Sequence, residues 1–477
     1  MSDATNAPEI GDLETDVAVV GGGPAGLHAA LMLARGGLRV AVLDESDALG
    51  GQYYKRRPAQ LAAAFGDFRP RGTELIRRVQ AAGVDCRTGT LVWGAEDAGR
   101  TLFTCDTDTG ALGRVRSRAT LAATGAYERS LPFPGWTLPG VVTPGFALHL
   151  ATMDRVPVGR RVVLAGTGPF LLPVACALLE VGAHIEALVE LNHPYRPGTS
   201  AIGALEQPAR LAEAGRYLLT LARHGVRVEQ GARVVAAHGD TQVTSVDIRG
   251  ADGRVRRVET DALCVGFGFR PSTELPRLLG AVTRTDPTGT EQLPVVDADF
   301  ATSVAGLYVA GDCAGIAGVH AAAVRGQLAA HAILRRLAPG RVVGRGEAVR
   351  VAVLRRRARS LERFAALADR LYPLPADAVA DLADSTQVCR CEGVSAGEIR
   401  QAVATGWNDL HGTKAATRAG MGPCQGRECG HVVAALAAQA PGGKPECFAA
   451  RMPLRPLPIA STTASSTAVD EREVTDR

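Results

Sequence analysis

The stretch "TDVAVVGGGPAGLHAALMLARGGLRVAVLDE" (residues 15–45) decides the fold of this chain. It opens with an apolar, β-branched run at residues 17–20, which predicts a buried strand. The glycine pattern Gly21-x-Gly23-x-x-Gly26 follows, and a stretch rich in Ala and Leu predicts a helix. A second apolar run then ends in two acidic residues. The stretch therefore predicts a strand–helix–strand unit rather than an isolated glycine pattern.

The three glycines have distinct roles in such a unit. Gly21 permits a tight turn, Gly23 lets a pyrophosphate approach the backbone, and Gly26 lets the helix pack closely on the strand. The helix that starts at Pro24 and Ala25 presents unpaired N–H groups and a positive dipole end to phosphates. These five positions predict a dinucleotide-binding turn; a glycine-rich turn in another α/β fold is the alternative.

An acidic residue about twenty positions after the first glycine binds a ribose hydroxyl in these units. Asp44 and Glu45 are both candidates. Counting to the following pair, Gly50 and Gly51, favours Glu45.

A second stretch, "GRRVVLAGTGPFLLPVACALLEVGAHIEALVE" (residues 159–190), repeats the pattern with Gly166-x-Gly168 but has Leu171 in the third position. A leucine there is expected to force the helix away from the strand and to crowd a pyrophosphate. Two interpretations remain: a nucleotide in a shifted pose, or, favoured here, a structural remnant that no longer takes nicotinamide. If the site works, Glu190 suits NAD over NADP, because a carboxylate repels a 2′-phosphate.

Two later stretches bear on the choice between FAD and NAD. "ATLAATGAYERSLPFPGW" (residues 119–136) runs from a strand into a Thr-Gly pair, and "TSVAGLYVAGDCAGIAGVHAAAVRGQLAA" (residues 302–330) runs from a strand into Gly-Asp and a helix. In this order, residues 15–330 resemble the two-dinucleotide-domain flavoproteins, the thioredoxin-reductase and glutathione-reductase-like enzymes. The resemblance implies FAD, with the ribityl chain on Asp312. The further positions implied are Thr124, Gly125 and Gly311.

The same resemblance implies that Gly51, Gln52 and Tyr53 lie near the adenosine or flavin edge, with a plain loop as the alternative, and that His320 lies near the flavin helix. Disulfide reductases of this superfamily also carry a close cysteine pair beside the flavin. Six cysteines of this chain show no such pairing, so dithiol–disulfide chemistry is not expected. These six are Cys86, Cys105, Cys176, Cys264, Cys313 and Cys447. Packing is the favoured role for Cys176, Cys264 and Cys313.

Four more cysteines gather in the tail, in "QVCRCEGVSAGEI" (residues 387–399) and "MGPCQGRECG" (residues 421–430). Soft thiolates select zinc, Cu(I) or iron–sulfur clusters. Structural zinc usually draws its ligands from Cys-x2-4-Cys pairs, and a one-residue spacing is tight for that geometry. A [2Fe–2S] cluster needs four thiolates, two for each iron. Between the two loops, Ser395, Glu398 and Gly406 predict a capped helix.

The tail resembles the bacterioferritin-associated-ferredoxin (BFD) type of [2Fe–2S] domain. The resemblance implies that the four thiols hold a [2Fe–2S] cluster, with zinc or unliganded thiols as alternatives. The ligands would be Cys389, Cys391, Cys424 and Cys429.

Nearly the whole chain resembles the A, or alpha, subunits of heteromeric amino-acid dehydrogenases, such as opine oxidase, hydroxyproline dehydrogenase, dye-linked proline dehydrogenase and hydrogen cyanide synthase. The resemblance rests on "PFPGWTLPGVVTPG", "LAGTGPFLLPVA", "DALCVGFGFRPSTEL" and "VCRCEGV…TRAGMGPCQGREC". It implies a glycine-oxidase-like FAD subunit that takes hydride from a C–N bond. This chain would relay the electrons through FAD and [2Fe–2S], with a small [2Fe–2S] ferredoxin-like protein as a possible third subunit. The alternatives are a self-contained NAD(P)H-dependent reductase and a non-catalytic scaffold subunit.

The expected fold is therefore α/β: a two-dinucleotide-binding-domain flavoprotein with a small, helical C-terminal [2Fe–2S] domain. The expected segments are a disordered N-terminus (1–14), the first part of the FAD domain (15–150), a degenerate NAD(P)-binding-like domain (151–285), the second part of the FAD domain (286–340), a helical linker arm (341–385), the cluster domain (386–440) and a disordered tail (455–477).

Bulk composition narrows the remaining classes. The 53 basic and 49 acidic residues leave a net charge of +4 with no basic run, which argues against nucleic acid as a partner. The acidic, polar N-terminus lacks the features of a signal peptide, and no apolar run reaches the length of a membrane span. We expect a cytoplasmic protein with reduced or metal-bound cysteines. The sequence marks no catalytic residue.

Overall fold

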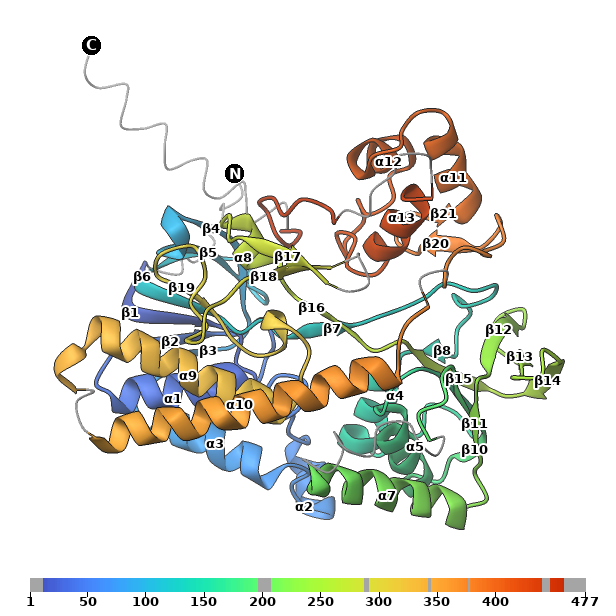
Figure 1. Cartoon of the computed structure of the whole chain (residues 1–477), viewed down its shortest axis with the longest axis horizontal. Coiled ribbons are helices and arrows are strands. Elements are labelled where there is room, and N and C mark those ends of the chain that lie inside the picture. Colours follow the sequence, from blue (N-terminus) through green and yellow to red (C-terminus); the bar gives the residue numbers. More distant parts are fainter. Residues whose placement is uncertain are drawn as a thin grey trace, which may run out of the picture.

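Two sheets, each built on one of the strand–glycine turn–helix units, organise the computed structural model of the chain (Figure 1). The first is mixed, because β5 runs antiparallel to β4 and β6, and the second is parallel. The structure describes residues 12–195, 207–286, 291–341, 345–375, 378–439 and 447–458. The expected disorder at residues 1–11 and 459–477 lies outside these ranges.

The first sheet has the strand order β3-β2-β1-β6-β5-β4, and β19 pairs with β6. Strand β1 (Leu13–Val20) lies between β2 (Val40–Leu43) and β6 (Leu112–Ala122), parallel to both. The carboxyl ends of these strands therefore meet at one edge of the sheet. The other strands are β3 (Asp85–Arg87), β4 (Thr90–Glu96), β5 (Thr101–Asp106) and β19 (Leu307–Val309).

The expected N-terminal disorder reaches too far. Leu13 and Glu14 pair with Val115 and Arg116 of β6, so the first strand already begins at Leu13. Backbone pairing to a distant strand holds this segment, which its own composition does not predict.

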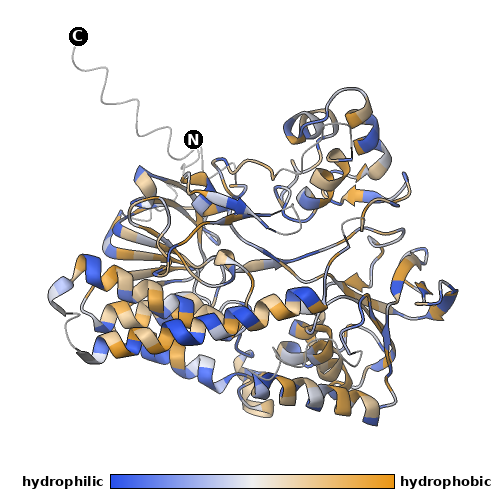
Figure 2. Ribbon diagram, viewed as in Figure 1, coloured by the Kyte–Doolittle hydropathy of each residue, from blue (hydrophilic) through white to orange (hydrophobic). Residues whose placement is uncertain are grey.

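Helix α1 (Pro24–Arg35) packs against α9 (Val319–Leu337), and α10 (Arg345–Leu371) lies along α9 (Figure 1). The helix expected in the linker arm over 341–385 is present as α10, but it packs against the first domain and is not a separate arm. Its residues Leu354, Ala358 and Leu361, which recur at helical spacing, are buried in the core of the first domain. Hydrophilic and hydrophobic residues alternate along α10, as expected of a helix covered on one side (Figure 2).

The second sheet has the order β11-β10-β9-β15-β8. Along the chain, the first strand of this sheet is β8 (Val141–Val142) and the last is β15 (Ala262–Gly266). The domain boundaries expected at 150 and 285 therefore both fall too late in the sequence. The chain then returns through β16 (Phe269–Pro271), which pairs with β7 (Ala126–Glu128) and forms a two-stranded link between the domains.

The remaining elements of these two domains are the helices that cover the sheets, the other strands of the second sheet, and the strands of the small antiparallel sheets. The helices are α2 (Ala59–Phe65), α3 (Pro70–Ala81), α4 (Pro144–His149), α5 (Leu171–Glu180), α7 (Pro208–Arg223) and α8 (Glu274–Leu278). The strands are β9 (Arg161–Gly166), β10 (His184–Glu190), β11 (Val228–Gln230), β12 (Arg233–His238), β13 (Ser245–Arg249), β14 (Val255–Glu259), β17 (Thr283–Thr285) and β18 (Gln292–Pro294).

A small helical domain follows with its own core. It holds β20 (Gln387–Cys389), β21 (Val394–Ser395), α11 (Ala396–Ala404), α12 (Leu410–Thr417) and α13 (Gly430–Ala437). The predicted capped helix is confirmed as α11. The Glu398 amide donates to Ser395 Oγ at 3.3 Å, and the Ser395 amide donates to Glu398 Oε2 at 2.8 Å.

This domain docks on the link between the other two. Trp136 Nε1 donates to the Gln387 carbonyl at 2.6 Å, and His431 Nε2 lies 2.8 Å from the Ser130 carbonyl. Leu131, just after β7, belongs to the core of the helical domain. The small helical domain therefore packs directly against the rest of the chain.

None of the described helices combines the length and the apolar character that crossing a membrane requires.

Candidate cofactor sites

The glycine turn of the first unit leaves no room for side chains at Gly21 and Gly26. Gly21 has φ +107°, and a Cβ atom on Gly26 would lie 2.0 Å from the Gly21 carbonyl oxygen. Helix α1 begins at Pro24, and the Leu27 amide donates to the Gly23 carbonyl at 2.9 Å. No side chain caps this helix start among the described residues, so its N–H groups face the turn. These features fit a bound pyrophosphate.

The two acidic candidates differ sharply in position. Asp44 is buried; its Oδ2 accepts from the Gly22 amide at 2.6 Å and its Oδ1 from the Ser46 amide at 2.9 Å. Glu45 has a side chain that is 52% exposed and pairs with Arg455 at 3.1 Å. The geometry reverses the preference for Glu45, because Asp44 is the carboxylate that lies against the glycine turn.

The residues expected on the flavin side lie at the same sheet edge. Thr124 and Gly125 follow β6, and the Thr124 hydroxyl donates to the Ser272 carbonyl at 2.8 Å. Asp312 follows β19, and its Oδ1 accepts from the amides of Ala317 and Gly318, both at 3.1 Å. Within the described residues its Oδ2 has no hydrogen-bond partner, which leaves it available to a ribityl hydroxyl.

The loop after Glu45 approaches the glycine turn with its backbone. The Gly50 amide donates to the Gly22 carbonyl at 2.9 Å, and a Cβ on Gly51 would lie 2.9 Å from the Gly23 Cα. Gln52 is exposed in this loop. Tyr53 is also exposed, and the Arg69 guanidinium lies over its ring, with Arg69 Cζ 4.6 Å from the ring centroid.

His320 is exposed at the start of α9. It lines a cavity of about 470 Å³ together with Arg210 and Arg357. Partial burial of the ring lowers the His320 pKa, and these two arginines lower it further.

The second glycine turn is built differently from the first. Pro169 corresponds to Pro24, yet α5 begins only at Leu171, two residues later. The Leu171 and Leu172 amides make loose contacts of 3.3 and 3.4 Å with carbonyls three residues back. Leu171 is buried, as are residues 162–166 of the strand it follows. The late, loose first turn agrees with the expectation that Leu171 displaces the helix.

An aromatic pair lies at this second turn. Phe170, which corresponds to Ala25 of the first unit, packs edge-to-face on Phe269 of β16 with ring centroids 5.3 Å apart. Glu190 is buried, which raises its pKa, and accepts from Thr167 Oγ1 at 2.8 Å and the Gly168 amide at 3.1 Å. Glu190 thus lies against the second turn much as Asp44 lies against the first.

The structure brings the four tail cysteines together as two thiol pairs. Cys389 and Cys429 are buried and hydrogen-bonded to each other. Cys391 is exposed and forms a hydrogen bond with the half-buried Cys424. The hydrogen bond from Cys429 lowers the pKa of Cys389 to about 5, and the amides of Gly420, Glu392 and Cys391 add to the effect.

The two metal alternatives make different demands on these four thiols. In the part of the chain that the structure describes, no three His, Cys, Asp or Glu side chains lie close enough to hold one ion. Zinc needs all four ligands on one atom, whereas a [2Fe–2S] cluster takes two thiolates on each iron. The two thiol pairs, with amides facing the Cys389 sulfur, match the two thiolates on each iron that a cluster takes.

Glycines make the cluster loop compact. A Cβ on Gly422 would lie 2.2 Å from the Cys391 Cβ. Gly420 and Gly426 lie under the Phe448 ring, where a Cβ would come within 2.6 and 2.5 Å of ring atoms. Sequence reasoning missed Phe448; its only signal was an aromatic residue just past the domain.

Several of the cysteines that the sequence assigned to packing are indeed buried. Cys313 donates from Sγ to the Ala310 carbonyl at 3.1 Å, and Cys264 is fully buried. Burial raises the pKa of Cys176 to about 11. None of the described cysteines forms a disulfide.

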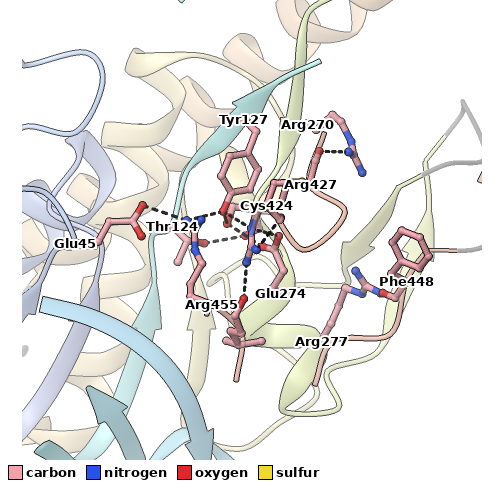
Figure 3. Close-up of polar contacts among 12 residues, drawn as sticks. Glu45, Thr124, Tyr127, Arg270, Glu274, Arg277, Cys424, Arg427, Phe448 and Arg455 are labelled. Carbon is pink, nitrogen blue, oxygen red and sulfur yellow. Dashed lines mark hydrogen bonds and ion pairs between the residues drawn. The ribbon is translucent and has the colours of Figure 1, made fainter. Parts of the chain in front are cut away.

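Arg427 joins the cluster loop to the first domain (Figure 3). Its Nη1 donates to the Cys424 carbonyl at 3.2 Å, its Nε donates to Tyr127 Oη at 3.0 Å, and the side chain pairs with Glu274 at 3.0 Å. Tyr127 lies on β7, directly after the Thr124–Gly125 turn. One buried guanidinium thus connects the surroundings of both candidate sites.

Fold and sites define a two-dinucleotide-domain α/β flavoprotein with an appended BFD-like domain. Residues 15–333 match the pyridine nucleotide-disulphide oxidoreductase family, which implies FAD. Residues 387–439 match the BFD-like [2Fe–2S] binding domain, which implies a [2Fe–2S] cluster. Within this class, the chain belongs to the family of flavoproteins that contains the A subunit of opine oxidase and the HcnB subunit of hydrogen cyanide synthase.

Curated relatives match along nearly their full length. The A subunit of opine oxidase from Rhizobium meliloti is 35% identical over 93% of this chain and 97% of its own. The HcnB subunit of hydrogen cyanide synthase from Pseudomonas aeruginosa is 34% identical over 86% of this chain and 90% of its own.

Solved structures share the fold. L-proline dehydrogenase from P. horikoshii superposes with a TM-score of 0.68 and 23% identity over 95% of this chain and 80% of that chain. Thioredoxin reductase of T. acidophilum superposes with a TM-score of 0.51 and 21% identity over 68% of this chain and 98% of its own.

Proposed function

We propose that this chain is the electron-transfer subunit of a heteromeric dehydrogenase for amino or imino acids of the opine, hydroxyproline or proline type. A glycine-oxidase-like FAD subunit would oxidise the C–N bond, and a small [2Fe–2S] ferredoxin-like protein would be a further partner. The observation that carries the proposal is that Arg427 connects two candidate cofactor sites within one chain. The second nucleotide turn, altered at Leu171, agrees with it.

A bound FAD takes up two electrons together and releases them singly, and a [2Fe–2S] cluster carries one at a time. For the FAD site we propose Asp44 as the ribose ligand and Asp312 as the ribityl ligand. The other proposed contacts are Gly21, Gly23, Pro24, Ala25, Gly26, Gly51, Gln52, Thr124, Gly125 and Gly311. The proposed cluster ligands are Cys389, Cys391, Cys424 and Cys429.

The relatives support this division of labour. The opine oxidase and hydrogen cyanide synthase proteins are both named as subunits, and each aligns over most of its length. The exposure of Cys391 favours electron exit on that side, because it brings one end of a cluster bound there close to an external acceptor.

Anaerobic mixing with NADH or NADPH is expected to leave the visible absorbance of the oxidised flavin unchanged. The displaced start of α5 and the Phe170–Phe269 pair leave the second turn poorly shaped for a nicotinamide nucleotide. Adding the partner subunit together with its amino-acid substrate should bleach the flavin and then reduce the cluster.

Two results would contradict the proposal in different ways. Rapid bleaching by NADH or NADPH alone would make the chain a self-contained reductase that feeds the cluster. Cofactors that stay oxidised in the complete complex with substrate would make it a scaffold subunit. Reduction by dithionite serves as the control that both cofactors can accept electrons.

A further inference from the structure

The chain does not end at the cluster domain but returns to the first sheet through residues 447–458, here called the return segment. The Leu454 amide donates to the Trp93 carbonyl of β4 at 2.7 Å, and the Leu454 side chain is buried in the core of the first domain. Met452 lies against Gly94, where a Cβ would come 2.7 Å from its sulfur. The expected disordered tail from 455 therefore starts too early.

Arg455 of the return segment spans the edge of the first sheet. Its Nη2 donates to Glu45 Oε1 at 3.1 Å and to Tyr127 Oη at 3.0 Å. Glu45 follows β2 and Tyr127 follows β6, the two strands that flank β1. The guanidinium thus crosses the carboxyl end of β1, where the glycine turn begins, and lies beside Thr124 (Figure 3).

Arg427 and Arg455 differ in how many of their N–H donors already have an acceptor. Every guanidinium nitrogen of Arg427 has an acceptor: Tyr127 Oη and Glu274 for Nε, the Cys424 carbonyl for Nη1 and the Leu454 carbonyl for Nη2. Its side chain is 9% exposed, against 26% for Arg455. Among the described residues only Nη2 of Arg455 has partners, so its Nε and Nη1 hydrogens are available to a ligand.

Charge at this edge favours the same role. Asp44 and Glu45 follow the same strand, and two carboxylates side by side repel a diphosphate. The cation of Arg455 offsets that repulsion and presents a planar fork of donors that matches phosphate oxygens. The pairing with Glu45 and Tyr127 holds the guanidinium in place without using up these donors.

We propose that Arg455 is a further cofactor-binding residue, which donates hydrogen bonds to the adenosine diphosphate half of FAD. The FAD site is then completed by the last described segment of the chain, which also braces the cluster loop through Phe448. This inference rests on the FAD site of the proposed function.

The test measures FAD binding by the deflavinated full-length chain, through quenching of flavin fluorescence. Arg455→Ala is expected to raise the Kd for FAD about 10-fold or more, the loss expected for a charge-assisted hydrogen bond. The Kd of Arg455→Lys is expected to fall between those of the wild type and Arg455→Ala. ADP should compete with FAD in the wild type and lose affinity by a similar factor in Arg455→Ala, while the cluster absorbance stays unchanged.

Arg451→Ala is the matched control. Arg451 is an exposed arginine of the same return segment, and we expect its removal to leave the Kd unchanged. If wild type, Arg455→Ala and Arg451→Ala all bind FAD with the same Kd, and all bind ADP with the same Kd, this inference alone is overturned. A wild-type chain that binds no FAD would overturn the proposed function together with it. Thermal unfolding of each variant checks that a weaker Kd does not come from a damaged fold.

Discussion

Replacing Cys391 with Ser is expected to abolish the visible absorbance and the electron paramagnetic resonance signal of the [2Fe–2S] cluster while FAD content stays unchanged. A cluster needs all four thiolates, and a serine hydroxyl is a hard, weakly acidic substitute for a soft thiolate. Cys391 is the exposed member of the four, so its replacement leaves the core of the small domain intact. Iron and sulfide analysis measures the loss directly.

Cys86→Ser is the matched control for this change. Cys86 is a half-buried thiol on β3, away from the small domain, and its replacement should retain the full cluster signal. A Cys391→Ser chain with an unchanged spectrum would show that the ligand assignment is wrong. Stoichiometric zinc in the wild type in place of iron would favour the zinc alternative, whatever the variant does.

Replacing Gly26 with Leu is expected to remove FAD from the first domain almost completely. The change installs at the first turn the residue that the second turn carries at Leu171. A Cβ on Gly26 would lie 2.0 Å from the Gly21 carbonyl oxygen, and backbone cannot move aside as a flexible side chain can. The helix start must shift, which withdraws its N–H groups from the phosphate site. Flavin released by denaturation, counted per chain, measures the effect.

Gly215→Ala is the control for this second change. Gly215 lies in α7, and apart from its chain neighbours and the backbone of its own helix a Cβ there would meet no described atom within 4 Å. The FAD content of Gly215→Ala should therefore equal that of the wild type. The cluster signal reports on folding of the small domain in both variants. Full FAD occupancy in Gly26→Leu would contradict the role assigned to the first glycine turn.

Features that depend on neighbouring residues could be predicted from the sequence. The glycine turn at Gly21–Gly26 and the capped helix from Ser395 each follow from a few adjacent positions, because the hydrogen bonds and close approaches that they require are local. The displaced start of α5 was likewise foreseeable from Leu171, since a larger side chain at a known crossing has a known steric effect.

Features that depend on which surfaces meet could not be predicted in this way. The periodicity of α10 indicated a helix but not that Leu354, Ala358 and Leu361 pack into the first domain. Counting residues favoured Glu45, yet the side-chain directions at the end of β2 place Asp44 against the turn.

By itself, then, the amino-acid sequence determined the two strand–turn–helix units, the four-cysteine pattern and the family, since these are written in short, ordered motifs. Only the tertiary structure decided how the four thiols pair, which carboxylate lies against the first turn, and that the return segment reaches the edge of the first sheet. Arg455 and Glu45 stand 410 positions apart, and no local pattern encodes a contact at that separation. It exists because Leu454 is buried on the first sheet and carries its neighbour to the strand ends.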